Sequence, residues 1–229
     1  MVIKAFEFSF LVTECTTTII DVIVKFRFII NKMQFQDSVC RCNWIKDDSD
    51  YLKYHDEEWG VPQYDDQKLF ELLVLESAEA GLNWLMILKK RENYRLAYDN
   101  FDPNKVAEFN EEKALELLNH KGIIRSKLKI KSSIQNAKRF LEIQKQYGSF
   151  SNYIWQYVDH KPILNNWLRS EDVPNETALS LAICKDMKKR GFTFIGSRII
   201  YAFMQAIGMV NDHPAYCFKY HKNQNGVNA

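Results

Sequence analysis

Two pairs of residues with metal-binding side chains lie near opposite ends of the sequence. Cys42 and His55 flank a segment with helical periodicity, and His213 and Cys217 stand at i and i+4, the spacing that places two side chains on one helical face. Two cysteines and two histidines suit tetrahedral zinc. Neither pair is a compact finger, so a bound metal would join the beginning of the chain to its end. The spacing also fits two unrelated pairs, and Cys40 is a possible competing ligand.

A carboxylate interrupts an apolar helical stripe at Glu76. At helical spacing Glu76 shares a face with Leu69, Leu72 and Leu73, whereas Glu71 points elsewhere. A carboxylate on an apolar face needs a partner or a shifted pKa, which is typical of residues that take part in catalysis or ligand recognition. The alternative is a glutamate near the end of a helix that reaches solvent.

Aromatic residues gather around these elements. They are Trp44, Tyr51, Tyr54, Trp59 and Trp84. Aromatic stripes usually belong to the core, and a pocket in which these rings stack on a ligand is the second interpretation.

Positive charge is concentrated in one stretch of the chain. Between Lys121 and Phe140 there are seven Lys and Arg residues and no acidic residue. The stretch begins where Gly122 joins two expected helices, and free backbone amides at the start of the second helix would bind a phosphate group. A helix-hairpin-helix uses this arrangement to hold a nucleic-acid strand without reading its sequence. An ordinary helix hairpin with a solvated basic face is the alternative, and clusters at 89–91 and 188–190 would extend a basic track.

The elements that must position these residues are helices. Apolar residues recur at spacings of three and four beyond residue 45, and no glycine-rich nucleotide loop follows a strand. The pattern predicts an all-α bundle. The expected helices run over residues 50–59, 66–80, 83–98, 111–119, 125–147, 150–159, 177–190 and 197–208.

The composition indicates a globular protein in a reducing compartment. Of the 229 residues, 46% are hydrophobic and 26% charged, with only 8 Gly and 5 Pro, which excludes collagen-like and wholly disordered chains. A net charge of +2 does not by itself indicate a polyanionic partner. Five cysteines, an odd number, argue against a secreted disulfide framework. No apolar run reaches the length of a membrane span, so we expect a cytoplasmic protein without membrane contact.

The N-terminal stretch differs in kind from the rest of the chain. Residues 1–32 are rich in β-branched residues and strand-like, whereas everything later is helical. Two interpretations remain open: Met33 is the true start, or the stretch is an extra strand or tail packed on the bundle. We divide the chain into an extension of uncertain status (1–38), one domain (39–222) and a C-terminal tail (223–229).

Several ordered motifs resemble the DNA-3-methyladenine glycosylase I family. The longest runs from Tyr51 to Pro62, and the resemblance extends from about Cys42 to Tyr220. The later motifs, in order, are Ala80–Trp84, Leu88–Arg95, Gly122–Arg125, Lys188–Phe192, Phe203–Ala206 and Asn211–His213.

The resemblance implies a helix-hairpin-helix DNA repair enzyme that flips 3-methyladenine out of alkylated DNA and hydrolyses its N-glycosidic bond. The family's zinc ligands fall on Cys42, His55, His213 and Cys217, its base-contacting carboxylate falls on Glu76, and its base-pocket aromatics fall on Tyr54 and Trp84, with Trp44, Tyr51 and Trp59 nearby. The hairpin that contacts the DNA backbone falls on Gly122, Ile123, Ile124 and Arg125 and on the helix after it, including Lys127 and Lys129. The resemblance also implies one structural zinc ion, a monomer that acts on double-stranded DNA, and free 3-methyladenine as the product.

Two residues depart from the family pattern. Glu79 stands where the family usually has glutamine, one turn from Glu76, and Asn83 replaces a serine with another helix-capping residue. Carboxylates at that spacing raise each other's pKa, so Glu79 puts fine substrate preference in doubt. The first competing hypothesis is a zinc-stapled DNA-binding protein with lost or altered glycosylase activity. The second is a helical protein that binds a small molecule.

Overall fold

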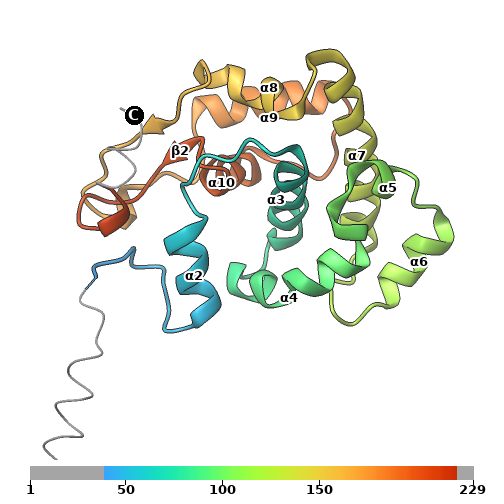
Figure 1. The fold of residues 1–229 in the computed structure, drawn as a ribbon, viewed down its shortest axis with the longest axis horizontal. Helices are drawn as coiled ribbons and strands as arrows, with labels where there is room; N and C mark the ends of the chain where they lie inside the picture. Colours follow the sequence, from blue (N-terminus) through green and yellow to red (C-terminus); the bar gives the residue numbers. More distant parts are fainter. Residues whose placement is uncertain (1–38, 221–229) are drawn as a thin grey trace, which may run out of the picture. The chain divides into compact units, whose positions relative to one another are not determined.

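The computed structural model describes residues 39–220, and residues from Cys40 on form one compact unit. The expected extension (1–38) and tail (223–229) lie outside the described residues. The helices are α2 (Ser49–Glu57), α3 (Asp66–Glu79), α4 (Trp84–Ala97), α5 (Pro103–Ala107), α6 (Glu111–Asn119), α7 (Lys127–Tyr147), α8 (Phe150–Trp155), α9 (Ala178–Lys189) and α10 (Ser197–Ala206) (Figure 1).

The mostly helical architecture agrees with the expectation, with local differences. All the expected helices are present, the one over 150–159 splits into α8 and a short 3-10 turn at Gln156–Val158, and α5 was not expected. Two strands of two residues each, β1 (Ile163–Leu164) and β2 (Val210–Asn211), pair in parallel. They link the connection between α8 and α9 to the segment after α10. Strands this short carry no strand-like sequence pattern, so periodicity could not reveal them.

Side-chain caps fix where the helices around the site begin. The Asp65 carboxylate accepts from Lys68 N at 2.9 Å and starts α3, and the side-chain oxygen Oδ1 of Asn83 accepts from Met86 N at 3.4 Å and starts α4. Between α3 and α4 the chain turns at Gly81, whose φ of +78° suits glycine. This short turn brings the end of α3 close to the start of α4.

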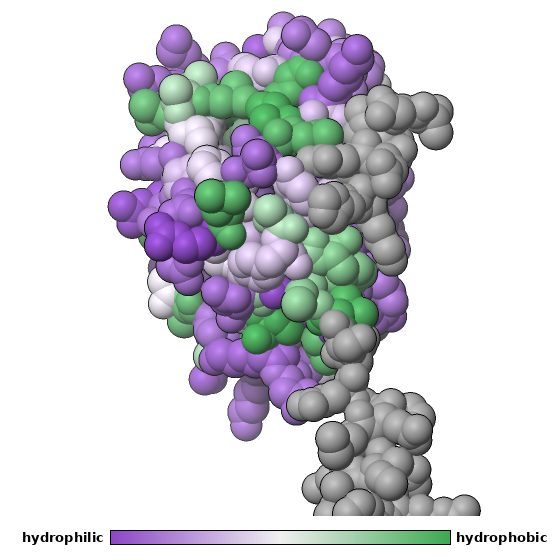
Figure 2. Space-filling view, turned by 90° about the vertical axis from the view of Figure 1, so that its left-hand side faces the viewer, coloured by the Kyte–Doolittle hydropathy of each residue, from purple (hydrophilic) through white to green (hydrophobic). Residues whose placement is uncertain are grey.

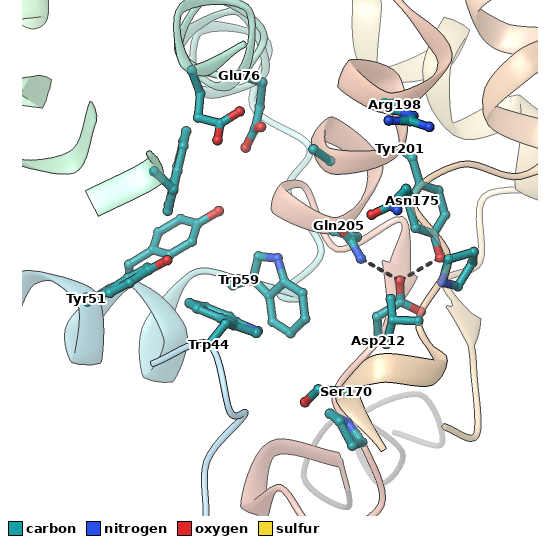
Figure 3. Close-up of a pocket in the computed structure, with 17 residues that line it drawn as sticks. Trp44, Tyr51, Trp59, Glu76, Ser170, Asn175, Arg198, Tyr201, Gln205 and Asp212 are labelled. Atoms are coloured by element: carbon teal, nitrogen blue, oxygen red, sulfur yellow. Dashed lines mark hydrogen bonds between the residues drawn. The ribbon is translucent and has the colours of Figure 1, made fainter. Parts of the chain in front are cut away.

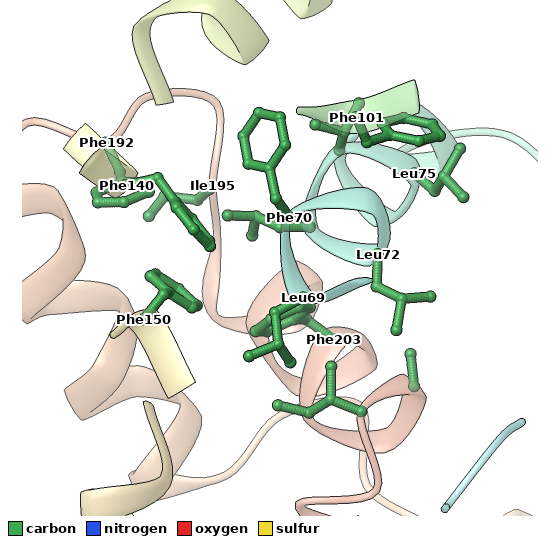
Figure 4. Close-up of a cluster of buried hydrophobic side chains, with 14 of the residues drawn as sticks. Leu69, Phe70, Leu72, Leu75, Phe101, Phe140, Phe150, Phe192, Ile195 and Phe203 are labelled. Carbon is green, nitrogen blue, oxygen red and sulfur yellow. The ribbon is translucent and has the colours of Figure 1, made fainter. Parts of the chain in front are cut away.

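Helix α3 lies at the centre of the described unit. It contacts α4, α7, α8 and α10, and most of its residues are buried (Figure 1). Leu69 and Phe70 pack against aromatic rings from the surrounding helices; the Phe70 and Phe140 ring centroids are 5.2 Å apart, and those of Phe140 and Phe150 are 4.1 Å apart (Figure 4). A rigid central helix holds the side chains near its C-terminal end in fixed positions.

A buried carboxylate joins α3 to α4. Glu71 is 2% exposed and accepts from the Arg91 guanidinium at 2.7 Å, from Arg95 at 3.0 Å and from Lys68 at 2.8 Å. Arg91 also pairs with Glu58, just after α2, at 2.8 Å. Burial by itself would raise the pKa of Glu71. The positive charges of Arg91 and Lys68 outweigh this effect and hold that pKa below its usual range. The network therefore ties together three of the helices that surround the site.

Replacing Glu71 with glutamine should destabilise the fold. The change leaves two arginines without their shared anion in a buried site, a loss of about 3 kcal/mol. A chain of this size then melts roughly 6–12 °C lower. Thermal unfolding followed by circular dichroism measures the shift. Glu92→Gln, which removes the exposed Arg95 partner on α4, is the matched control and should change the melting temperature little; equal shifts would contradict the role of Glu71.

On the face shown in Figure 2, the hydrophobic residues form several separate areas with hydrophilic residues between them. Among the described residues, no helix is long and apolar enough to cross a membrane.

Candidate active site and metal centre

A cavity of about 570 Å³ lies between α2 and α3 on one side and α10 with the segment 170–175 on the other (Figure 3). The structure brings the predicted aromatic residues together around it with two acidic residues of α3, Glu76 and Glu79. Its lining on this side consists of Trp44, Tyr51, Tyr54, Trp59, Trp84, Glu76 and Glu79. A volume of this size is ample for a purine base.

The aromatic side chains form two groups of neighbouring rings. Trp44 lies 5.1 Å from both Tyr51 and Trp59, measured between ring centroids, and Tyr54 lies 5.2 Å from Trp84. Tyr54 is 3% exposed, so its ring is fixed by packing. Rings held in this way offer π-faces on which a planar base can stack.

Glu76 faces the cavity from the last turns of α3 (Figure 3). It is 6% exposed, which rules out the interpretation of a glutamate that reaches solvent. Among residues 39–220 the structure gives its carboxylate no hydrogen-bond or ion-pair partner. Burial raises the pKa of Glu76 well above its usual value, and the nearby Glu79 charge raises it further. The carboxylate is therefore available to a ligand that carries a positive charge or a hydrogen-bond donor.

Glu79 lines the same cavity one turn further along α3. Burial raises the pKa of Glu79, and the positive charge of Lys129 opposes the shift. The Lys129 ammonium donates to the carbonyl oxygens of Ala78 and Ala80 at 2.8 Å each. These bonds satisfy carbonyls at the C-terminal end of α3. The structure thus places the expected DNA-backbone residue Lys129 against this helix end.

The opposite wall of the cavity contains an aspartate that sequence reasoning missed. Asp212 is 1% exposed; one carboxylate oxygen accepts from Asn165 and Trp167 at 2.7 Å each, the other from Tyr201 at 2.6 Å and Gln205 at 2.7 Å (Figure 3). Asp212 and Gln205 stand in motifs that carry the family resemblance, which was the available signal. Four donors compensate the buried charge, so Asp212 fixes the side chains of this wall.

The two Cys/His pairs meet in one buried group. The Sγ of Cys42 lies 3.3 Å from His55 Nε2 and 3.5 Å from His213 Nδ1, and the Sγ of Cys217 lies 3.5 and 3.4 Å from the same nitrogens. Sulfur and nitrogen ligands of a tetrahedral zinc ion stand ~3.5 Å apart. All four ligand atoms lie within 4.8 Å of one another, so this group could hold a metal ion.

In both histidines, the ring nitrogen that does not face the cysteine sulfurs also has a partner. His55 Nδ1 lies 2.7 Å from an Asp56 carboxylate oxygen, and His213 Nε2 lies 3.2 Å from the carbonyl oxygen of Trp59. Such partners orient the ring so that the other nitrogen faces the metal. The donor set and its supporting bonds therefore fit a tetrahedral metal ion.

The local structure around His213 and Cys217 differs from the expectation. The two residues lie in a loop and turn, with Cys217 N donating to Pro214 O at 2.8 Å, and not on one face of a helix. Proline at 214 removes a backbone donor, which favours the turn. Cys40 is exposed and outside the group, so it does not compete as a ligand.

The connection between α6 and α7 runs over residues 120–126, and three of its backbone amides have partners in the protein. Gly122 N donates to His120 Nδ1, Ile123 N to the His120 carbonyl, and Ile124 N to the hydroxyl of Tyr94, at 3.1, 3.3 and 3.1 Å. The three amides of residues 122–124 are therefore engaged within the protein. Glycine is needed at 122 for a different reason: a Cβ there would lie 2.7 Å from Asn93. Ile123 is buried at 3% exposure.

One arginine of each smaller basic cluster makes internal contacts. Arg91 belongs to the Glu71 network, and Arg190 donates to Asp186 at 2.7 Å and to the Tyr147 hydroxyl at 2.6 Å. These two arginines are committed to the fold, whereas Lys188 and Lys189 are exposed.

Comparison with known proteins agrees with this geometry. Residues 44–220 match the family model described as methyladenine glycosylase. The chain belongs to this family, and it is a glycosylase. It is 45% identical to DNA-3-methyladenine glycosylase 1 of Escherichia coli (strain K12) over 184 residues, which are 80% of this chain and 98% of that protein.

Solved structures extend the likeness to three dimensions. A crystal structure of 3-methyladenine DNA glycosylase I is 45% identical, with a TM-score of 0.76, and the match covers 78% of this chain and 98% of that one. A tyrosine-to-phenylalanine variant of such an enzyme, solved in complex with 3-methyladenine, is 36% identical with a TM-score of 0.77, covering 79% of this glycosylase and 97% of that chain.

Proposed function

We propose that this glycosylase flips 3-methyladenine out of alkylated double-stranded DNA and hydrolyses its N-glycosidic bond, leaving an abasic site. The observation that carries the proposal is the Glu76 carboxylate, buried and without a protein partner in the described chain, facing a cavity lined by aromatic rings. The relative bound to 3-methyladenine supports the choice of base. Methylated DNA incubated with the enzyme should release 3-methyladenine, whereas DNA binding without release would indicate a protein that has lost the activity.

The proposed reaction requires selection of the damaged base more than it requires acid catalysis. Methylation at N3 makes the adenine cationic, so the base leaves as a neutral molecule without protonation by the enzyme. Rings such as Trp84 would stack on the flipped base while the Glu76 carboxylate accepts hydrogen bonds from its edge. A negative carboxylate in a poorly solvated cavity favours a cation over ordinary adenine.

We assign no covalent step to the protein. Among the residues that the structure describes, no lysine lines the cavity between α3 and α10, and Lys129 is held by the carbonyls at the end of α3. A Schiff-base intermediate needs a lysine amine at the sugar. The enzyme is therefore monofunctional: the abasic product should remain uncut until alkali is added, and borohydride should trap no protein on the DNA. Strand cleavage by the enzyme alone would contradict this assignment.

We propose that the Cys/His group holds one structural zinc ion. Cys42, His55, His213 and Cys217 would fill all four positions of a tetrahedral ion, leaving none for water or substrate. The metal's contribution is to close the segment before α2 against the segment after β2, beside the cavity wall that contains Trp59. Since one chain supplies both the cavity and these ligands, we propose that the protein acts as a monomer.

We propose that the α6–α7 hairpin contacts the DNA backbone through the first turn of α7 and the side chains of Arg125 and Lys127. Removing both charges with Arg125→Ala and Lys127→Ala should weaken binding to undamaged duplex and lower the salt dependence of the affinity by about one to two in log–log slope. Fluorescence anisotropy at several salt concentrations measures both. An unchanged slope would place the DNA on another surface.

Glu79, which stands where the family usually has glutamine, should affect the pH dependence of activity. The Glu79 charge raises the pKa of Glu76, so its removal lowers that pKa. Because the proposed mechanism needs Glu76 ionised, the acid limb of kcat/KM for base release in the wild type should lie above the usual pKa of a glutamate. In Glu79→Gln the limb should move to lower pH. A shift to higher pH, or no shift, would show that the two carboxylates do not interact.

A further inference from the structure

Among the described residues, one cationic side chain lines the cavity: Arg198, which has no part in the chemistry proposed for the base. Arg198 is the second residue of α10, and Tyr201, Ala202 and Gln205 of the same helix also line the cavity. Spacings of three, four and seven place these residues on one face of the helix. Tyr201 is buried where it donates to Asp212, whereas Arg198 is exposed. The stripe therefore runs from the interior to the rim, with Arg198 at the rim.

The acidic and basic side chains of the cavity lie at different depths. Glu76 and Glu79 lie on α3, the buried Asp212 on the opposite wall is satisfied by its four donors, and Arg198 lies on α10 at the rim (Figure 3). Among the described residues, no carboxylate forms an ion pair with Arg198. An arginine at the entrance of a site for a cationic base lowers the affinity for that base unless it meets an anion of the same ligand. The arrangement thus fits a ligand that is positive at its inner end and negative at its outer end.

A flipped nucleotide of a methylated purine has this distribution of charge. Its base is cationic and enters the pocket, while its sugar stays at the entrance and its phosphates remain in the DNA strand outside. Arginine binds phosphate oxygens through a planar fork of N–H donors. We propose that Arg198 is a positioning residue that binds a backbone phosphate next to the flipped nucleotide and holds the base between the aromatic rings and Glu76. This proposal rests on the proposed function and adds a residue to it.

The test separates a phosphate contact at the pocket from general attraction of DNA. In Arg198→Ala, KM for release of 3-methyladenine from methylated duplex should rise roughly threefold to tenfold, with kcat changed less. The dependence of log(kcat/KM) on log salt should become shallower by about 0.9, the loss of one phosphate contact. Arg198→Lys should recover part of the loss because it keeps the charge without the fork.

The charge control is Lys145→Ala. Lys145 is exposed near the C-terminal end of α7, a helix of 21 residues, so it stands roughly 30 Å from the hairpin end of that helix. This variant should match the wild type in KM. Binding of undamaged duplex should differ little between Arg198→Ala and Lys145→Ala, because the proposed contact forms only when a nucleotide is flipped.

Three results would overturn the proposal. They are a KM for Arg198→Ala equal to that of Lys145→Ala, an equal loss of affinity for undamaged and methylated duplex, and a changed affinity for free 3-methyladenine, which has no phosphate. A wild-type enzyme that releases no base would instead contradict the proposed function, so the two failures are distinguishable.

Discussion

Cys42→Ala should abolish metal binding and lower the melting temperature of the glycosylase by roughly 8–16 °C. Cys42 is 2% exposed, and its sulfur lies within 3.5 Å of both histidine ligands. Loss of a structural metal is among the most destabilising single changes, about 4 kcal/mol, and 1 kcal/mol corresponds to roughly 2–4 °C for a chain of this size. The effect is large because the group joins segments that are 171 residues apart in the sequence.

The matched control for this change is Cys40→Ala. Cys40 stands two residues away, is exposed and lies outside the Cys/His group. Zinc measured by mass spectrometry of the purified protein should be one per chain in the wild type and in Cys40→Ala, and none in Cys42→Ala. A wild type without zinc, or a Cys42→Ala variant that keeps both its zinc and its melting temperature, would contradict the proposed metal site.

Glu76→Gln should reduce kcat/KM for 3-methyladenine release by about 10- to 100-fold. Glutamine keeps the shape and much of the hydrogen-bonding capacity of Glu76 but removes the charge that favours a cationic base. A hydrogen bond to a charged group contributes about 1.5–3 kcal/mol, and each 1.4 kcal/mol is a factor of ten.

The same variant should be more stable than the wild type at neutral pH. Burial raises the pKa of Glu76, so ionising it above that pKa costs more in the folded than in the unfolded chain, and the free energy of unfolding falls as the pH rises through this range. Glutamine has no such penalty. A rise in melting temperature together with a loss of activity would show that the loss does not come from unfolding.

Glu79→Gln and the double variant complete this comparison, because neighbouring groups need not act additively. Glu79 is expected to modulate activity through the pKa of Glu76. If Glu76→Gln keeps full activity while Glu79→Gln abolishes it, the base-contacting carboxylate lies one turn further along α3 than we propose.

The sequence was most informative where a local pattern determines the structure. Helix α3 follows from a 3.6-residue stripe, which a single segment displays by itself, and the buried Glu76 is one of the two interpretations that the stripe allowed. The grouping of Cys42 with His213 depended on the family resemblance, since spacing alone also allowed two unrelated pairs. The long helices likewise begin at capping residues that are visible in the sequence, such as Asp65 and Asn83.

Features that depend on distant contacts could not be predicted in this way. The donors to Asp212 come from segments up to 47 residues away, so no local pattern marks it. The Ile124 amide donates to Tyr94, which stands 30 residues earlier, so no local pattern marks this contact. Lys129 looked like part of a basic face until the fold placed the end of α3 beside it.

The most direct test of the central claim is base release by the wild-type enzyme. Duplex DNA methylated with a simple alkylating agent is incubated with excess enzyme, and the released bases are separated and identified by mass spectrometry. We predict that free 3-methyladenine appears at a rate well above that without enzyme, that unmodified adenine is not released, and that the DNA acquires alkali-labile sites in equal number. Tight binding to the same DNA with no release of 3-methyladenine would contradict the account.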